Sequence, residues 1–160
     1  MGDAQKITTC LWFDNQAEAA ANFYCSVFKN SKVKDVVRYG DAGPGPKGDA
    51  MVVTFDLDGR EFMGLNGGPK FKFTEAISLV VHCKDQAEID YFWETFTADG
   101  GQESQCGWLK DKFGLSWQIV PGIIGELMTG TPEQTNRVMM AVMTMKKLNL
   151  QKMKDAYDGK

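Results

Sequence analysis

The sequence predicts an α+β fold made of two paired βαβββ modules, because two stretches of the chain are nearly the same. Asn15-Gln16-Ala17-Glu18 and Asp85-Gln86-Ala87-Glu88 each place a helix-capping side chain three positions before a glutamate, which is the spacing of a capping box. A short apolar run precedes each stretch, and aromatic residues follow each one. Each half then ends in a hairpin-like segment, at 58–63 and at 113–118. One strand–helix–strands module is therefore used twice.

The first module is expected at about residues 5–68. Residues 7–13 are rich in β-branched and aromatic side chains and short enough for a strand. Apolar residues then recur at helical spacing from about 16 to 29. Glycines and prolines make 40–48 a loop, and the Asp58-Gly59 pair is a strong hairpin signal. The remaining strands are expected at 32–39, 51–57 and 61–65.

The second module, at about 74–122, repeats this order. A strand at 77–83 precedes a helix from 86 to about 98, and the next strands are expected at 105–109 and 115–120. A C-terminal helical tail at about 123–160 lies outside the repeat. Thr131-Pro132 opens its first helix, with threonine as the cap and proline at the first helical position. A short helical segment follows at 150–157.

Size and composition describe an ordinary globular protein. The 160 residues make one domain, with 43% hydrophobic and 24% charged residues. The formal net charge of −3 gives no basic surface for nucleic acid, and no apolar run reaches the roughly 20 residues that span a bilayer. The N-terminal residues contain no apolar secretion signal. The four cysteines are widely spaced, which indicates buried thiols and a cytoplasmic location.

Three motifs carry a resemblance to a known family. They are Leu11-Trp12-Phe13-Asp14, the stretch FMGLNGGP at 62–69 and the stretch CGWLKDKFGLSWQ at 106–118. Over roughly residues 5–157 the chain resembles the PhnB-like family, often labelled 3-demethylubiquinone-9 3-methyltransferase. That family is a branch of the vicinal-oxygen-chelate superfamily, which includes glyoxalase I, extradiol dioxygenases and bleomycin-resistance proteins. The resemblance implies two paired βαβββ units, commonly in a homodimer.

Metal-dependent members of that superfamily place His or Glu at four strand positions. Carried over by the resemblance, these positions fall on Ile7, Met63, Ser78 and Gln118, none of which is a good ligand for a divalent ion. The chain contains a single histidine, His82. We therefore expect no metal and no cofactor. Methyl transfer is also disfavoured, because no strand runs into a glycine-rich turn that opens a helix.

Paired modules are expected to curve their sheets into a cup, with the helices outside and a ligand site inside. Trp12 and Trp117 alternate with the cup-facing positions, so we expect both to pack under the helices. Trp108 is expected near the site, as a wall of the pocket or as core. The side chains expected to line the cup, with Trp108 nearby, are Thr9, Leu11, Met63, Leu65, Ser78, Val80 and Gln118.

Several residues allow two interpretations. Gln118 either bonds a ligand or satisfies a buried neighbour, and His82 is either a proton shuttle or a structural residue at the end of a strand. The methionines between 139 and 153 form either an adaptable binding surface or core and dimer contacts. Lys70 and Lys72 either attract an anion or protect a strand edge. The loop at 40–48 is either a lid or a plain connection.

Three functional hypotheses follow. The first is a cytoplasmic, homodimeric, metal-free protein that binds a small, largely apolar organic molecule in its cup. The second is an enzyme of the superfamily, of the glyoxalase, dioxygenase or, least favoured, methyltransferase type. The third is a structural or regulatory protein that captures a partner through its C-terminal helices.

Overall fold

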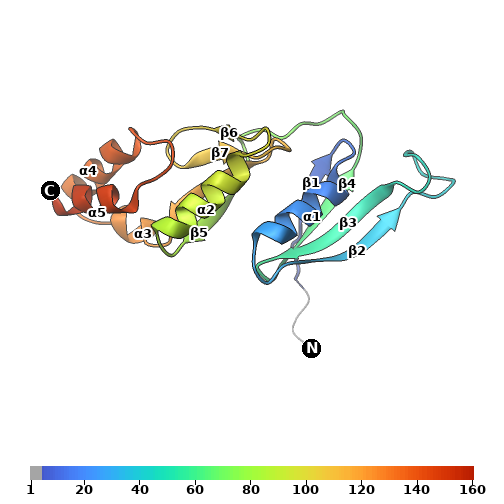
Figure 1. Ribbon diagram of the computed structural model, residues 1–160, viewed down its shortest axis with the longest axis horizontal. Coiled ribbons are helices and arrows are strands. Elements are labelled where there is room, and N and C mark those ends of the chain that lie inside the picture. The colour runs from blue at the N-terminus through green and yellow to red at the C-terminus, as the bar shows by residue number, and fades with distance from the viewer. Residues whose placement is uncertain (1–4) are drawn as a thin grey trace. The chain divides into compact units, whose positions relative to one another are not determined.

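The computed structural model describes residues 5–160, which divide into two compact units. The first unit ends at Lys72 and the second begins at Phe73. Each unit contains one four-stranded sheet with a helix packed on it (Figure 1). Within the described residues, no helix combines the length and the apolar character needed to cross a membrane.

The first unit forms a mixed sheet in which the first strand lies beside the last. The strand order is β1-β4-β3-β2, with β1 parallel to β4 and the other neighbours antiparallel. Asp58 and Gly59, both with positive φ, make the two-residue turn between β3 and β4, as expected for an Asp-Gly hairpin. The elements are β1 (Thr9–Phe13), α1 (Ala17–Val27), β2 (Lys32–Arg38), β3 (Ala50–Leu57) and β4 (Arg60–Asn66).

The second unit repeats this arrangement. Its strand order is β5-β8-β7-β6, and β5 runs parallel to β8 as β1 does to β4. The expected α+β fold with two βαβββ modules is therefore confirmed. The elements are β5 (Ser78–Cys83), α2 (Gln86–Thr97), β6 (Gln102–Glu103), β7 (Trp108–Lys110) and β8 (Ser116–Pro121).

The two helices begin differently, although their sequences are alike. In α2 the Asp85 side chain accepts a hydrogen bond from the Glu88 amide at 2.9 Å, as the capping-box spacing indicates. In α1 the cap is Gln16, which makes no side-chain cap bond, so the expected cap at Asn15 is wrong. The first amide of α1, that of Ala17, instead donates to Asn66 Oδ1 on β4 at 2.8 Å. A distant residue thus replaces the local cap.

The core of each unit lies between its helix and one face of its sheet. In the first unit, Tyr24 of α1 packs against Phe55, and both side chains are fully buried. Gly64 lets α1 approach β4 closely, because a Cβ at this position would lie 3.1 Å from the Cβ of Ala17. In the second unit, Phe96 of α2 stacks on Trp117 of β8 with ring centroids 4.4 Å apart.

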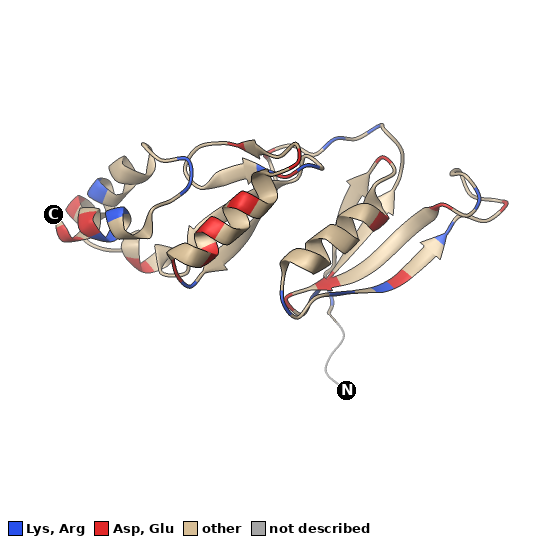
Figure 2. Ribbon diagram, in the orientation of Figure 1, with Lys and Arg blue, Asp and Glu red and all other residues tan. Residues whose placement is uncertain are grey.

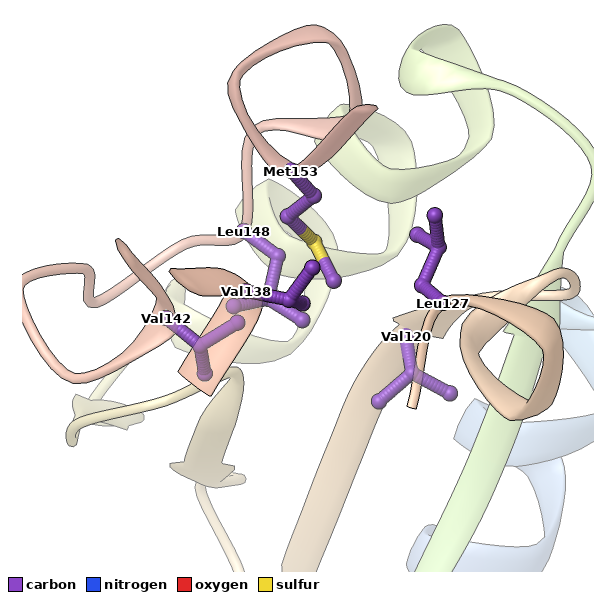
Figure 3. Close-up of a cluster of buried hydrophobic side chains, with 6 residues drawn as sticks. All are labelled: Val120, Leu127, Val138, Val142, Leu148 and Met153. Atoms are coloured by element: carbon purple, nitrogen blue, oxygen red, sulfur yellow. The ribbon is translucent and has the colours of Figure 1, made fainter. Parts of the chain in front are cut away.

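A C-terminal tail of three helices completes the second unit. Its buried side chains meet Val120 at the end of β8 (Figure 3). Gln86 at the start of α2 fastens the tail, because its amide group bonds the backbone of both Leu148 and Leu150. Thr131 caps its helix as expected, and Gln134 completes a capping box with it. The first short helix of the tail was not predicted. The three helices are α3 (Ile124–Leu127), α4 (Pro132–Val142) and α5 (Leu150–Asp158).

Charged side chains are spread over both units rather than sorted by sign. Figure 2 shows acidic residues along α2 and a mixture of both signs on the C-terminal helices. The ion pairs, such as Arg38–Glu18 at 3.0 Å, join partly exposed side chains. Such pairs contribute about 0–1 kcal/mol each to stability. The fold therefore depends mainly on its two helix–sheet cores.

Candidate ligand-binding site

The pleat of the second sheet separates its side chains into two faces. Trp117 points to α2, so its register partners Leu79 and Leu109 lie on the same, helix-covered face. Residues one position away lie on the opposite face, because successive side chains of a strand alternate. We call this opposite side the open face of the second sheet. It carries Ser78, Val80, His82, Gln102, Trp108, Lys110, Ser116 and Gln118, and also Val120, over which the C-terminal tail packs.

The sequence-predicted residues of the second module meet on this face. Val80 and Trp108 are the register partners of Gln118 on its two sides, and Ser78 lies two residues before Val80. Gln118 Nε2 donates to Ser78 Oγ at 2.9 Å. Gln118 thus forms a hydrogen bond with a neighbouring side chain, which agrees with one of the two interpretations of this residue. Val80 remains 45% exposed, so the face presents apolar surface beside this polar pair.

A cavity of about 370 Å³ lies against this face. Its walls combine an indole ring, an ion pair and a hydroxyl group. Lys110 Nζ lies 2.6 Å from Glu75 Oε1, just before β5. This hydrogen bond and the positive charge of Lys110 lower the pKa of Glu75 from its ordinary value. The lining residues include Glu75, Gln102, Ser104, Trp108, Lys110 and Ser116.

Ser116 is the unusual member of this lining. The residue is only 1% exposed, and within residues 5–160 its Oγ has no hydrogen-bond partner. Buried hydroxyl groups are normally bonded, since an unpaired one loses its hydration without compensation. Sequence reasoning missed Ser116, although its position two residues before Gln118 on the same strand was a usable signal. It also missed Lys110, which was assigned only to a turn.

The first sheet corrects the assignment for the first module. Leu11 is 4% exposed, and it lies beside Gly64 on the face that α1 covers. Thr9 shares that face by alternation. The expectation that Leu11 lines the open side is therefore wrong by one residue, and in a strand a one-residue shift moves every side chain to the other face. Met63 and Leu65 alternate with Gly64 and do lie on the open face, as expected.

The same shift explains the tryptophans. Trp12 lies on the open face of the first sheet, opposite Leu65 in the register, and not under the helix as expected. Its ring meets Phe71 edge-on at 4.9 Å, and its indole N–H donates to the carbonyl of Gly68 at 2.9 Å. Trp117, in contrast, packs under α2 as expected.

The residues carried over to the superfamily's metal positions are poor ligands for a divalent cation. Across residues 5–160, no three His, Cys, Asp or Glu side chains gather in a way that could hold an ion. Met63, Ser78 and Gln118 offer a thioether, a hydroxyl and an amide, and the last two bond each other. Such donors do not fit a divalent cation, which prefers carboxylate, imidazole or thiolate ligands. His82 is exposed at the end of β5.

A second, larger cavity of about 560 Å³ lies in the first unit, beside the Gly/Pro loop. Its main polar groups already bond one another. Arg38 pairs with Glu18 and also donates to the carbonyl of Gly48, while the Tyr39 hydroxyl donates to the carbonyl of Asn66 at 2.6 Å. The buried side-chain atom that lacks a partner among residues 5–160, Ser116 Oγ, lines the cavity on the second sheet and not this one. We therefore take the open face of the second sheet as the candidate site.

Solved structures share this fold. A putative 3-demethylubiquinone-9 3-methyltransferase, the PhnB protein from Bacillus cereus, is 39% identical with a TM-score of 0.67, covering 72% of this chain and 99% of its own. Protein PA1353 from Pseudomonas aeruginosa is 17% identical with a TM-score of 0.60, covering 74% and 98%. The fosfomycin resistance protein FosX from Listeria monocytogenes is 14% identical with a TM-score of 0.54, covering 81% and 100%. The last two show the fold alone.

Among curated proteins, none matches the chain. A family model described as 3-demethylubiquinone-9 3-methyltransferase matches residues 5–120. This segment contains both βαβββ modules and ends before α3, so the helical tail lies outside the match. The chain therefore belongs to this PhnB-like, 3-demethylubiquinone-9 3-methyltransferase family.

Proposed function

We propose that this protein binds a small, largely apolar organic molecule on the open face of the second sheet, without a catalytic metal. The observation that carries the proposal is the cavity of about 370 Å³ beside Trp108. Small-molecule sites are typically about 300–1,000 Å³ and combine apolar walls with a few polar groups. Trp108 supplies an apolar wall of the cavity and Lys110 and Ser116 supply polar groups. Val80, Ser78 and Gln118 lie on the same face of the sheet and are proposed as further contacts.

The polar pair supports binding rather than metal chemistry. The bond between Gln118 and Ser78 holds both side chains in place without any ion. An amide next to a hydroxyl can orient a neutral polar group of a ligand by hydrogen bonds. Within the first unit, Met63 and Leu65 are proposed as ligand contacts of that unit's own sheet. Thr9 and Leu11 are not, because they face α1.

We also propose that the chain forms a homodimer. Large apolar side chains remain exposed in both units, among them Val37, Val80 and Phe71. Contiguous groups of exposed apolar side chains often mark the surfaces through which proteins associate. Size-exclusion chromatography with light scattering measures the mass directly, and a monomer at micromolar concentration contradicts this part. The four cysteines, all free, fit a reducing cytoplasm.

The strands and turns of this chain do not support the methyltransferase activity that the family name suggests. S-adenosylmethionine is usually held by a parallel sheet whose first strand runs into a glycine-rich turn. Here each sheet has a single parallel pair, and β1 is followed by Asp14, Asn15 and Gln16 before α1. We therefore take the family name to indicate relatedness, and we do not propose a methyltransferase activity.

The test combines native mass spectrometry with elemental analysis of freshly purified protein. A bound organic mass without stoichiometric metal supports the proposal, whereas one metal per chain contradicts it. Binding of neutral 2-naphthamide by calorimetry then locates the site. Trp108→Ala should weaken binding at least about tenfold, since aromatic contacts supply much of the affinity for such ligands. Tyr91→Ala removes an exposed aromatic ring of α2, away from the open face, and should leave the affinity unchanged.

A further inference from the structure

We infer that the cavity on the second sheet takes the carboxylate of an aromatic acid, with Lys110 and Ser116 donating to the carboxylate and Trp108 flanking the ring. This inference rests on the proposed function and names the class of ligand for the same site. It is carried by the groups that line the cavity and by the one among them that lacks a partner.

Ser116 shows that the lining is incomplete as it stands. Its neighbours in the register are Ser78 on one side and Lys110 on the other. Ser78 Oγ already bonds Gln118, and Lys110 bonds Glu75. The Ser116 hydroxyl is thus left buried without a donor or acceptor among residues 5–160. A ligand oxygen in the cavity would satisfy it.

Two donors of the lining lie side by side, the ammonium group of Lys110 and the hydroxyl group of its register partner Ser116. Lys110 carries three N–H groups, Ser116 an O–H group and Trp108 an indole N–H group. Two carboxylates also line the cavity, Glu75 and Glu103. Glu103 already accepts from the indole of Trp93 at 2.9 Å and lies 3.7 Å from Lys146 Nζ. The unpaired hydroxyl group of Ser116 beside Lys110 favours a ligand acceptor, and the ammonium group favours a negatively charged one.

Glu75 is the competitor for this ammonium group. It lies before β5, outside any strand, and its side chain is 62% exposed. A ligand carboxylate would bind Lys110 in its place, and Glu75 could then turn to solvent. Removing the charge of Glu75 should therefore strengthen the binding of an aromatic acid. The same change should leave a neutral aromatic amide unaffected.

The experiment compares two probes of one shape, 2-naphthoate and 2-naphthamide, by isothermal titration calorimetry. The wild-type protein should bind the acid at least about tenfold more tightly than the amide, as one charge-assisted contact allows. Lys110→Met should bring the ratio close to one, and Glu75→Gln should tighten only the acid, about threefold or more. Lys154→Met, an exposed lysine of α5, is the matched control and should change neither probe.

The Ser116→Ala variant gives a second, independent test of the inference. Removing an unpaired buried hydroxyl should leave the unfolding midpoint in urea unchanged or raise it, while the acid binds several-fold more weakly. The indole ¹H–¹⁵N signal of Trp108 should shift with either probe. Equal affinity for acid and amide in both wild type and Lys110→Met overturns the inference but leaves the proposed function standing. Failure of both probes to bind and to shift the Trp108 signal contradicts both.

Discussion

Burial decides what individual polar side chains do in this protein. Cys83 is buried, and the loss of hydration is the main reason why the pKa of its thiol rises to about 12, with the charges of Glu88 and Asp85 adding to the effect. At neutral pH this thiol is therefore protonated and unreactive. Ser116 is equally buried but unpaired, which makes it a candidate for ligand contact. The sequence predicted the burial of Cys83 correctly, whereas the expectation that Cys10 is buried is wrong, since it is exposed. The environment of Ser116 could not be predicted, because it depends on which strands become neighbours.

Asp111 is the buried carboxylate on which the turn between β7 and β8 depends. Its Oδ1 accepts from the amides of Phe113 and Leu115 at 2.8 and 3.1 Å, and its Oδ2 accepts from the indole of Trp117 at 2.8 Å. Asp111→Ala should lower the free energy of unfolding by about 2–4 kcal/mol, since it leaves buried donors unpaired. Urea denaturation followed by tryptophan fluorescence measures this change.

Asp111→Asn is the graded control. Its amide oxygen can still accept from the two backbone N–H groups, but its NH₂ group cannot accept from Trp117. The loss should therefore fall between that of the alanine variant and zero. A free energy of unfolding for Asp111→Ala within about 0.5 kcal/mol of wild type would contradict the assigned role.

At the scale of elements, local signals gave good predictions where the determinant is local. The Asp58-Gly59 turn, the helix cap at Thr131 and the helix after Asp85 all lie where the sequence indicated. Predictions failed where the determinant is distant. The cap of α1 comes from β4, and the facing of β1 depends on its register with Gly64. Alternation alone fixes which residues share a face but not which face the helix covers.

The start of α1 allows a direct test of this distinction. Asn66 is nearly buried, accepts from the amide of Ala17 and donates to the carbonyl of Ala50 at 3.0 Å. Asn66→Ala should cost about 1–3 kcal/mol of stability, because it removes a helix cap and leaves a buried carbonyl unpaired. Asn15→Ala should change stability by less than about 0.5 kcal/mol, since Asn15 is exposed and is not the cap. The Trp12 indole signal during urea unfolding reports on this unit, and equal losses in both variants would contradict the prediction.

At the scale of the whole molecule, the repeat is the feature that the sequence displays most clearly. Both sheets have the same strand order, and the family match covers both modules. Part of the candidate site could be predicted from the sequence, since Ser78, Val80, Trp108 and Gln118 share a face as expected. The ion pair and the unpaired hydroxyl beside them were not predicted, because the sequence indicated one strand at 105–109 where the structure has β6 at Gln102–Glu103 and β7 at Trp108–Lys110. The periodicity of the sequence predicts which residues share a face of a strand. A cavity cannot be predicted in this way, because it forms only when the strands are assembled into a sheet.

The C-terminal tail raises a question that belongs to the whole chain, namely whether it stabilises the second unit or serves a partner. Val138 of α4 is fully buried in the cluster against β8, whereas Met140 of the same helix is exposed (Figure 3 shows Val138). Val138→Ala should cost about 2 kcal/mol of stability, through lost burial and the cavity left behind. Met140→Ala should stay within about 0.5 kcal/mol of wild type.

Urea unfolding followed by the indole signals of Trp93, Trp108 and Trp117 reports on the second unit, and the signal of Trp12 reports on the first. If the tail is an integral part of the second unit, Val138→Ala lowers the midpoint of the three former signals and leaves that of Trp12 unchanged. An unchanged midpoint for all four would mean that the tail contributes nothing to stability. The cluster that joins Val120 to the tail makes the first result the expected one, because the same side chains that end β8 begin the core of the tail.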